Sequence, residues 1–385
     1  RISRCVALAC DIARIYGSHM NETDVDSLAK LLCDLFMHAK STVRGKTLQG
    51  FSVIAMFGSD AIFDSIATFL EGKLEHIDSA SLDLAKAAAA GLTHFVKDSG
   101  TRWQSRASEL ASRLMLVVSQ EVDEDDDELA FDELREELIY VLSYLVEKCS
   151  STLAPSIVLQ LHTFGLHYIK HDPNHVEQDE GSDDDEFYDD DDDDGGDFDN
   201  DEDVSWKVRS RAARLLGMLY ARYSRLLEVF WESSSELFSS MSEREEIVLL
   251  DILGSLRKLL AVSRFAPKGP ALLSDRFKQI NGALVMVLKA KSPRIKHAAF
   301  ACMRDVCLVL PTAFCDHPGT LRKFVETTAP SMAGNTANYG LVTEGLLCLQ
   351  QLFHNYAGAD SGEVVSIVVQ PLLLVMASNY YKVSV

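Results

Sequence analysis

Apolar side chains recur at helical spacing along almost the whole chain. After Leu134, apolar residues follow at offsets of 4, 7, 8 and 11 positions, and the same offsets follow Val208. Such offsets place the side chains on one face of an α-helix. Strict alternation of apolar and polar residues, which predicts β-strands, is nearly missing from the sequence. The pattern therefore predicts a chain built of amphipathic helices.

One short pattern returns before many of these helices: a small polar residue, then a β-branched residue followed by a basic one. Ser or Asp at such a position can cap a helix start, and proline suits the first turn. With these anchors, we predict that the second helices of successive helix pairs start near residues 42, 79, 127, 204, 242, 292, 336 and 380. The pattern reads "KSTVRGKTLQGF" from Lys40, "VSWKVRSRAARLL" from Val204, "KSPRIKHAAFACM" from Lys291 and "NYYKVSV" from Asn379.

The spacing of these starts predicts the fold class. Most of them follow one another after 37 to 50 residues, and helix pairs with a period of about 40–47 residues are typical of HEAT and armadillo repeats. A chain of 385 residues is also too long for one compact all-helical globule. We predict an all-α HEAT-repeat α-solenoid of about seven and a half helix pairs.

An acidic segment interrupts this array. Between Asp179 and Asp203 the sequence has 17 Asp or Glu and no Lys or Arg, so the net charge of −21 falls to −21 + 17 = −4 without it. The segment lies between a predicted first helix at 152–170 and a second at 205–223. We therefore expect HEAT-like repeats at 1–170, an acidic disordered loop at 171–204 and further repeats at 205–385.

Composition excludes several classes of function. A local acidic block repels phosphates and argues against nucleic acid as the main ligand. No apolar stretch reaches the ~18–20 residues needed to span a membrane. The eight cysteines show no disulfide-like spacing, so we expect reduced thiols and a cytoplasmic and nuclear location. The chain starts with Arg and ends in what resembles an unfinished helix, so we expect a piece of a longer protein.

No pattern in the sequence predicts an enzyme, a cofactor or a specific metal site. Phosphate-binding glycine loops, G-x-S-x-G and H-E-x-x-H are all missing. Three groups of residues could be considered as metal ligands, but helix packing or a solvated acidic loop explains each of them more simply. They are Cys302, Cys307, Cys315 and His317; His162, His167, His171 and Asp172; and an EF-hand-like run from Asp190 to Asp201.

Basic residues follow the acidic segment immediately. We select Lys207, Arg211 and Arg214 as candidate partner-binding residues, with neutralisation of the acidic loop as the alternative. The basic position of the recurring pattern is held by Arg44, Arg209 and Lys296. At these three positions we expect a structural ladder between neighbouring repeats.

The surroundings of the acidic segment resemble a known family. "HDPNH" at 171–175, a long acidic insertion and then "DEDVSWKVRSRAARLL" at 201–216 are similar to the cullin-associated, neddylation-dissociated proteins. "STVRGKTLQGFSVIAMFGSDAIF" and "KAKSPRIKHAAFACMRDVCLVLP" agree with that family in the same order. The chain departs from it at "LAFDE", which is inserted after the acids that follow Val122.

The resemblance implies a non-catalytic HEAT-repeat scaffold. Members of the family wrap around an unneddylated cullin and its RING subunit, and they regulate the assembly, neddylation and substrate-receptor exchange of cullin–RING ubiquitin ligases. The part similar to this chain is implied to bind the cullin C-terminal region and the RING subunit, while a second chain or further repeats complete the solenoid. The alternative is an importin-β-like nuclear transport receptor whose acidic loop contacts basic cargo. Such receptors lack the Lys-Val-Arg run that follows Trp206 here.

Overall fold

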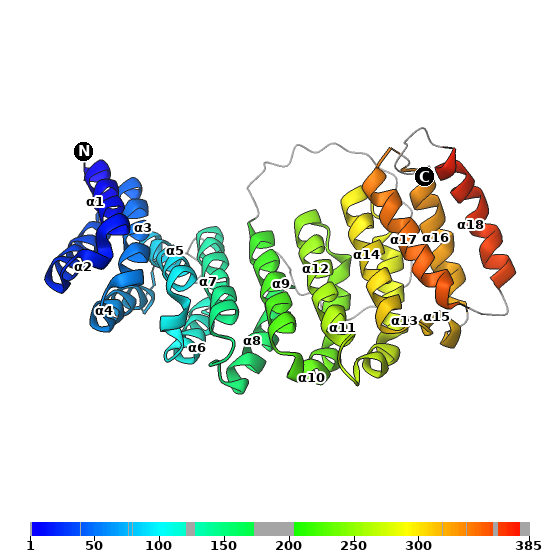
Figure 1. The fold of residues 1–385 in the computed structure, drawn as a ribbon, viewed down its shortest axis with the longest axis horizontal. Helices are drawn as coiled ribbons and strands as arrows, with labels where there is room; N and C mark the ends of the chain where they lie inside the picture. Colours follow the sequence, from blue (N-terminus) through cyan, green and yellow to red (C-terminus); the bar gives the residue numbers. More distant parts are fainter. Residues whose placement is uncertain are drawn as a thin grey trace.

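The structure is a computed structural model that describes residues 2–38, 40–75, 77–78, 80–120, 128–172, 204–317, 319–335, 337–356 and 361–377. These residues form 18 α-helices and five short 3-10 helices, and none of them is in a β-strand. The helices follow one another in sequence order along an elongated array, with α1 and α18 at opposite ends (Figure 1). The predicted all-α HEAT-repeat α-solenoid is confirmed.

One layer of the array is made by the second helix of each pair. Each helix of this layer packs against the next one along the solenoid. The helices are α1 (Ile2–Tyr16), α3 (Ser41–Phe57), α5 (Leu82–Ser99), α7 (Glu128–Cys149), α9 (Ser205–Arg222), α12 (Glu246–Ser263), α14 (Pro293–Val309) and α17 (Tyr339–Asn355). We call this layer the second-helix row.

The first helices of the pairs form the other layer. They are α2 (Glu22–Phe36), α4 (Asp60–Glu71), α6 (Ala107–Val118), α8 (Pro155–Tyr168), α10 (Leu227–Glu232) with α11 (Ser234–Ser239), α13 (Gly269–Val287), α15 (Ala313–Asp316) with α16 (Thr320–Ala333), and α18 (Ser361–Met376). The fifth first helix is split into α10 and α11 at a run of three serines, a residue that competes with helical hydrogen bonding.

The predicted helix starts agree closely with the structure. The second helices begin at residues 41, 82, 128, 205, 246, 293 and 339. The largest shift, from 242 to 246, arises because Ser240–Ser242 forms a 3-10 turn before α12. The start predicted near 380 lies outside the described residues. At α14 the predicted cap is confirmed, since the Ser292 side chain accepts a hydrogen bond from the Ile295 amide and Pro293 opens the helix.

A continuous apolar core runs between the two layers from α1 to α18. Close helix contact depends on small residues at several positions. A Cβ on Gly165 of α8 would lie 2.8 Å from Leu216 Cδ2 of α9, so only glycine allows this approach. The array continues on both sides of the acidic segment, because α9 packs against both α7 and α8. No helix within the described ranges is both long and apolar enough to cross a membrane.

Candidate partner-binding surface

Ion pairs connect successive members of the second-helix row. Each pair joins a basic side chain to an acidic side chain on the neighbouring helix. Together they connect α5 to α7, α7 to α9, α9 to α12, α12 to α14 and α14 to α17. The pairs are Lys86–Glu133 at 2.9 Å, Arg211–Glu136 at 2.8 Å, Arg214–Asp251 at 2.9 Å, Arg257–Asp305 at 2.8 Å and Arg304–Glu344 at 3.1 Å. We call this set the second-helix ladder. A partly exposed pair contributes only about 0–1 kcal/mol, so the ladder follows from the packing of the helices and adds little to their stability.

The structure places two of the predicted partner-binding residues within this ladder. Arg211 is 21% exposed, pairs with Glu136 and lies 4.1 Å from the centre of the Tyr140 ring. Arg214 is 49% exposed and reaches the opposite neighbour, Asp251. Both arginines therefore already have intramolecular partners on adjacent repeats.

Lys207, the third predicted residue, lies at the start of α9. Its Nζ is 5.9 Å from the centre of the Trp206 ring, and it forms no ion pair with any described residue. Of the three, its ammonium group is the one left for an external anion in the described part of the chain. The partner-binding role of Lys207, Arg211 and Arg214 stays a prediction.

The ladder expected at the recurring basic position is present in part. Arg44 Nη1 donates to the Asp83 carbonyl of the next repeat at 3.2 Å. Arg209 Nε donates to Glu243 Oε2 at 2.8 Å, across to the segment before α12. Lys296 forms no ion pair with a described residue, so at this position the expected ladder does not continue through salt bridges.

Arg209 also ties together the two flanks of the acidic segment. Its Nη1 donates to the His171 carbonyl at 2.9 Å and to the Ser205 hydroxyl at 2.8 Å. His171 precedes the segment and Ser205 follows it. One guanidinium thus contacts both described flanks of the insertion.

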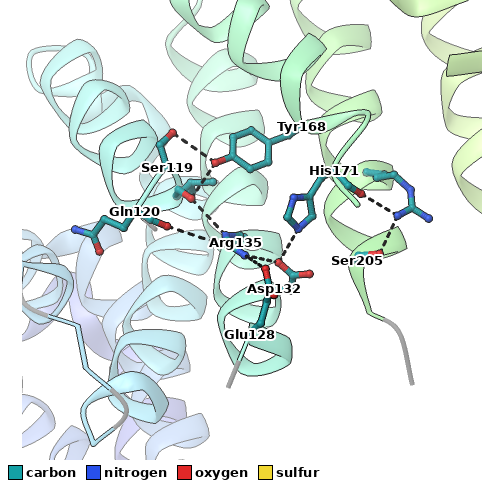
Figure 2. A network of polar contacts seen from close by, with 10 residues as sticks. Ser119, Gln120, Glu128, Asp132, Arg135, Tyr168, His171 and Ser205 are labelled. Atoms are coloured by element: carbon teal, nitrogen blue, oxygen red, sulfur yellow. Dashed lines mark hydrogen bonds and ion pairs between the residues drawn. The ribbon is translucent and has the colours of Figure 1, made fainter. Parts of the chain in front are cut away.

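A buried network extends this tie toward α6 and α7 (Figure 2). His171 Nε2 lies 2.9 Å from Asp132 Oδ1, and Arg135 Nη1 donates to the same oxygen at 2.7 Å. Arg135 also donates to the Val118 and Gln120 carbonyls at 3.4 Å each. Burial opposes ionisation of Asp132, but the hydrogen bonds from His171 and Arg135 outweigh it and lower the pKa of this carboxyl. The network therefore holds an ionised aspartate at the junction of two repeats.

Sequence reasoning missed this network. The residues come from α7, from the end of α6 and from the segment after α8, and Asp132 lies within the acidic and apolar run "LAFDELREEL". The one available signal was Arg135 three positions after Asp132, which is the spacing of neighbours on a helix.

The histidines considered as metal ligands line one pocket, but they are not placed to hold a metal ion together. His162 is buried against Tyr220 and Phe230, with ring centres 5.8 and 4.8 Å away, and burial lowers its pKa to about 4. His171 contacts Asp132 and belongs to the network above.

The cysteines offer no ligand set either. Cys302 and Cys307 are buried thiols whose pKa is raised by burial, while Cys315 is exposed. The described residues contain no group of three or more side chains placed to hold a metal ion. The EF-hand-like run at 190–201 lies outside them.

Comparisons with known proteins agree with this architecture. No protein-family model matches the chain. Cullin-associated NEDD8-dissociated protein 1 of Arabidopsis thaliana is 26% identical over 392 residues, which cover 99% of this chain and 31% of that protein. The protein of the same name from Dictyostelium discoideum is 24% identical over 397 residues, with the same two coverages. Cullin-associated NEDD8-dissociated protein 2 of Mus musculus is 27% identical over 379 residues, covering 93% and 29%.

Solved structures show the same fold at lower identity. Importin beta superposes with a TM-score of 0.60 at 13% identity, over 97% of this chain and 42% of that one. The karyopherin Kap121p, bound to the SUMO protease Ulp1p, gives 0.59 at 12% identity, over 98% and 34%. The chain spans about a third of the length of the curated relatives. Over nearly its whole length, the chain is thus similar to the N-terminal third of the cullin-associated NEDD8-dissociated proteins, as the motifs around the acidic segment predicted.

Proposed function

We propose that this chain is part of a non-catalytic scaffold that binds a cullin and so regulates cullin–RING ubiquitin ligases. The observation that carries the proposal is its similarity to proteins named for their association with cullins, which extends over 93–99% of the chain in three relatives from distant organisms. After the acidic segment, the motif residue Arg209 donates a hydrogen bond to the Ser205 hydroxyl and forms an ion pair with Glu243. The motif thus has a definite structural task in this chain.

The shape of the solenoid supports such a role. A row of parallel helices exposes a surface along many repeats, and solenoids use surfaces of this kind for large protein partners. A standard interface buries about 800 Å² on each partner. Because the continuous apolar core fixes each helix relative to the next, a partner would meet a surface that is already arranged for binding, which lowers the entropic cost of association.

The finer features of the proposal follow from the resemblance. We propose that the chain binds the C-terminal region of the cullin together with its RING subunit, in the form without NEDD8, in the cytoplasm and nucleus. No cofactor, nucleic acid or membrane takes part. The acidic segment at 179–203 would raise the rate of encounter with a basic partner surface more than the final affinity.

The test is direct binding of the chain to a purified cullin–RING core, with and without NEDD8, by calorimetry at physiological salt. We expect binding to the unmodified core alone. Lys207→Glu should weaken it, whereas the exposed Lys278→Glu on α13 makes the same change of charge on the other layer and should not. No binding to either core, or equal binding to both, would overturn the proposal. Tight binding to a GTP-loaded Ran-type GTPase, with none to the cullin core, would replace it by transport-receptor function.

A further inference from the structure

A groove lies between α12 and α14, on the second-helix row beside the Arg257–Asp305 pair. Leu260 and Val309 are buried residues at its base, and Leu308 is half-buried. Phe265 stands at the end of α12 and is 83% exposed, more than any other large apolar side chain in the described residues. An isolated exposed apolar residue is ordinary. Here it adjoins an apolar hollow, so the two together offer a place for an apolar side chain from outside.

The groove is open because a glycine lines it. Gly254 is in the middle of α12, where glycine costs about 1 kcal/mol relative to alanine. A Cβ built on Gly254 would meet no atom within 4 Å, so packing does not require glycine at this position. The consequence of the missing side chain is free space along the wall of the groove.

The rim of the groove is basic. Its lining includes three cations and a single acid, Asp305, which is already paired with Arg257. Lys258 and Arg264 form no ion pair with a described residue, and the Arg264 guanidinium lies 5.7 Å from the centre of the Phe265 ring. At physiological salt, charges more than about 8 Å apart are largely screened. The local cations therefore decide which ligands this groove attracts, despite the net negative charge of the chain.

A second glycine leaves room for one of these cations. A Cβ on Gly217 of α9 would lie 3.1 Å from both Cδ and Nζ of Lys258. The lysine stem thus extends along α9, and its ammonium group is close to that helix and to Arg214. Burial lowers the pKa of Lys258, and the positive charge of Arg214 lowers it further, against the attraction of Asp251. The negative charge of an incoming carboxylate would oppose both effects by stabilising the charged ammonium group.

We propose that the groove between α12 and α14 binds a short acidic segment of a partner protein that carries an apolar side chain. Carboxylates of the segment pair with Lys258 and Arg264, and its apolar side chain packs between Phe265 and Leu308. Charge complementarity selects this occupant, since a basic or purely apolar segment would leave the two cations without partners. The proposal goes beyond cullin binding and does not depend on it.

The test uses the complete chain and a short fluorescein-labelled peptide of Asp and Glu around a central Phe-Leu pair, measured by fluorescence anisotropy. We expect saturable binding that weakens at least about 10-fold in Phe265→Ala and in Lys258→Glu. The matched controls are Met286→Ala on α13, where the side chain is 64% exposed, and Lys278→Glu. Neither control should change the affinity. Gly254→Leu should abolish binding by filling the groove while the melting temperature stays the same or rises.

Three results would overturn the proposal. The first is the absence of binding by the unmodified chain, and the second is an equal loss in the control variants. The third is equal binding of an acidic peptide without the Phe-Leu pair, or of single-stranded DNA, because the groove would then be a general anion-binding surface. A photo-crosslinking residue in place of Phe265 distinguishes a partner segment from the chain's own acidic segment as the occupant of the groove. Crosslinks to the chain's own residues 179–203 would assign the groove to that segment instead of a partner.

Discussion

Arg209 provides the sharpest test of how the solenoid holds its acidic insertion. Its side chain and that of Glu243 are each only 11% exposed, and their ion pair measures 2.8 Å. Removing one partner of a buried pair costs about 3–5 kcal/mol, and an exposed pair contributes about 0–1 kcal/mol. Because both side chains are little exposed, the stability cost of Arg209→Ala should be close to that of breaking a buried pair. We expect a loss of about 2–4 kcal/mol, because a carboxylate and two hydrogen-bond acceptors lose their partner together.

The assay is urea unfolding followed by circular dichroism, together with hydrogen–deuterium exchange of the amides in α9 and the residues before position 172. The exchange measurement is needed because repeat arrays can unfold in parts. Arg214→Ala is the matched control, since its pair with Asp251 has an arginine that is 49% exposed. It should cost at most about 1 kcal/mol.

A double variant separates the effect of the unpaired charge on stability from the effect of lost side-chain packing. Arg209→Met with Glu243→Leu removes both charges and should recover part of the loss, because no unpaired ion is left in a buried position. The reasoning would be refuted if Arg209→Ala cost no more than Arg214→Ala, or if exchange at the start of α9 were unchanged.

Three further predictions concern the insertion, a buried histidine and the helix contacts. Deletion of 179–203 should leave the melting temperature and the equilibrium affinity for the partner nearly unchanged, because the contacts that tie the flanks do not involve it; a cooperative loss of folding would contradict this. His162 has its pKa lowered from 6.5 to about 4 by burial, so the unfolded chain binds more protons than the native one between these values. Stability should therefore fall by up to about 1.4 kcal/mol per pH unit as the pH drops from 6.5 toward 4, and His162→Leu should flatten this slope in pH-dependent urea titrations. Gly165→Ala should destabilise by about 1–3 kcal/mol through its clash with Leu216, whereas Gly282→Ala, where a Cβ meets nothing within 4 Å, should stabilise by up to about 1 kcal/mol in the same melts.

The groove between α12 and α14 shows why single residues resist prediction. Its parts are distributed over α12 and α14, and one of its cations packs in the space left by a glycine on α9. In the sequence, Phe265 is one of 18 phenylalanines, and nothing around it distinguishes it from a core residue. Its exposure follows from its position just after the last turn of α12. Only the relative placement of the helices brings these residues to one hollow.

The sequence by itself determined the fold class, the helix starts to within a few residues and the family resemblance. These properties depend on local periodicity, helix caps and short motifs, which are complete within about one repeat. Only the tertiary structure decided which charges meet. Arg211 pairs with a glutamate 75 positions away, and Arg209 with one 34 positions away. Such pairs depend on how each helix is rotated against its neighbour. That rotation is set by side-chain packing along the whole row, which no local pattern contains.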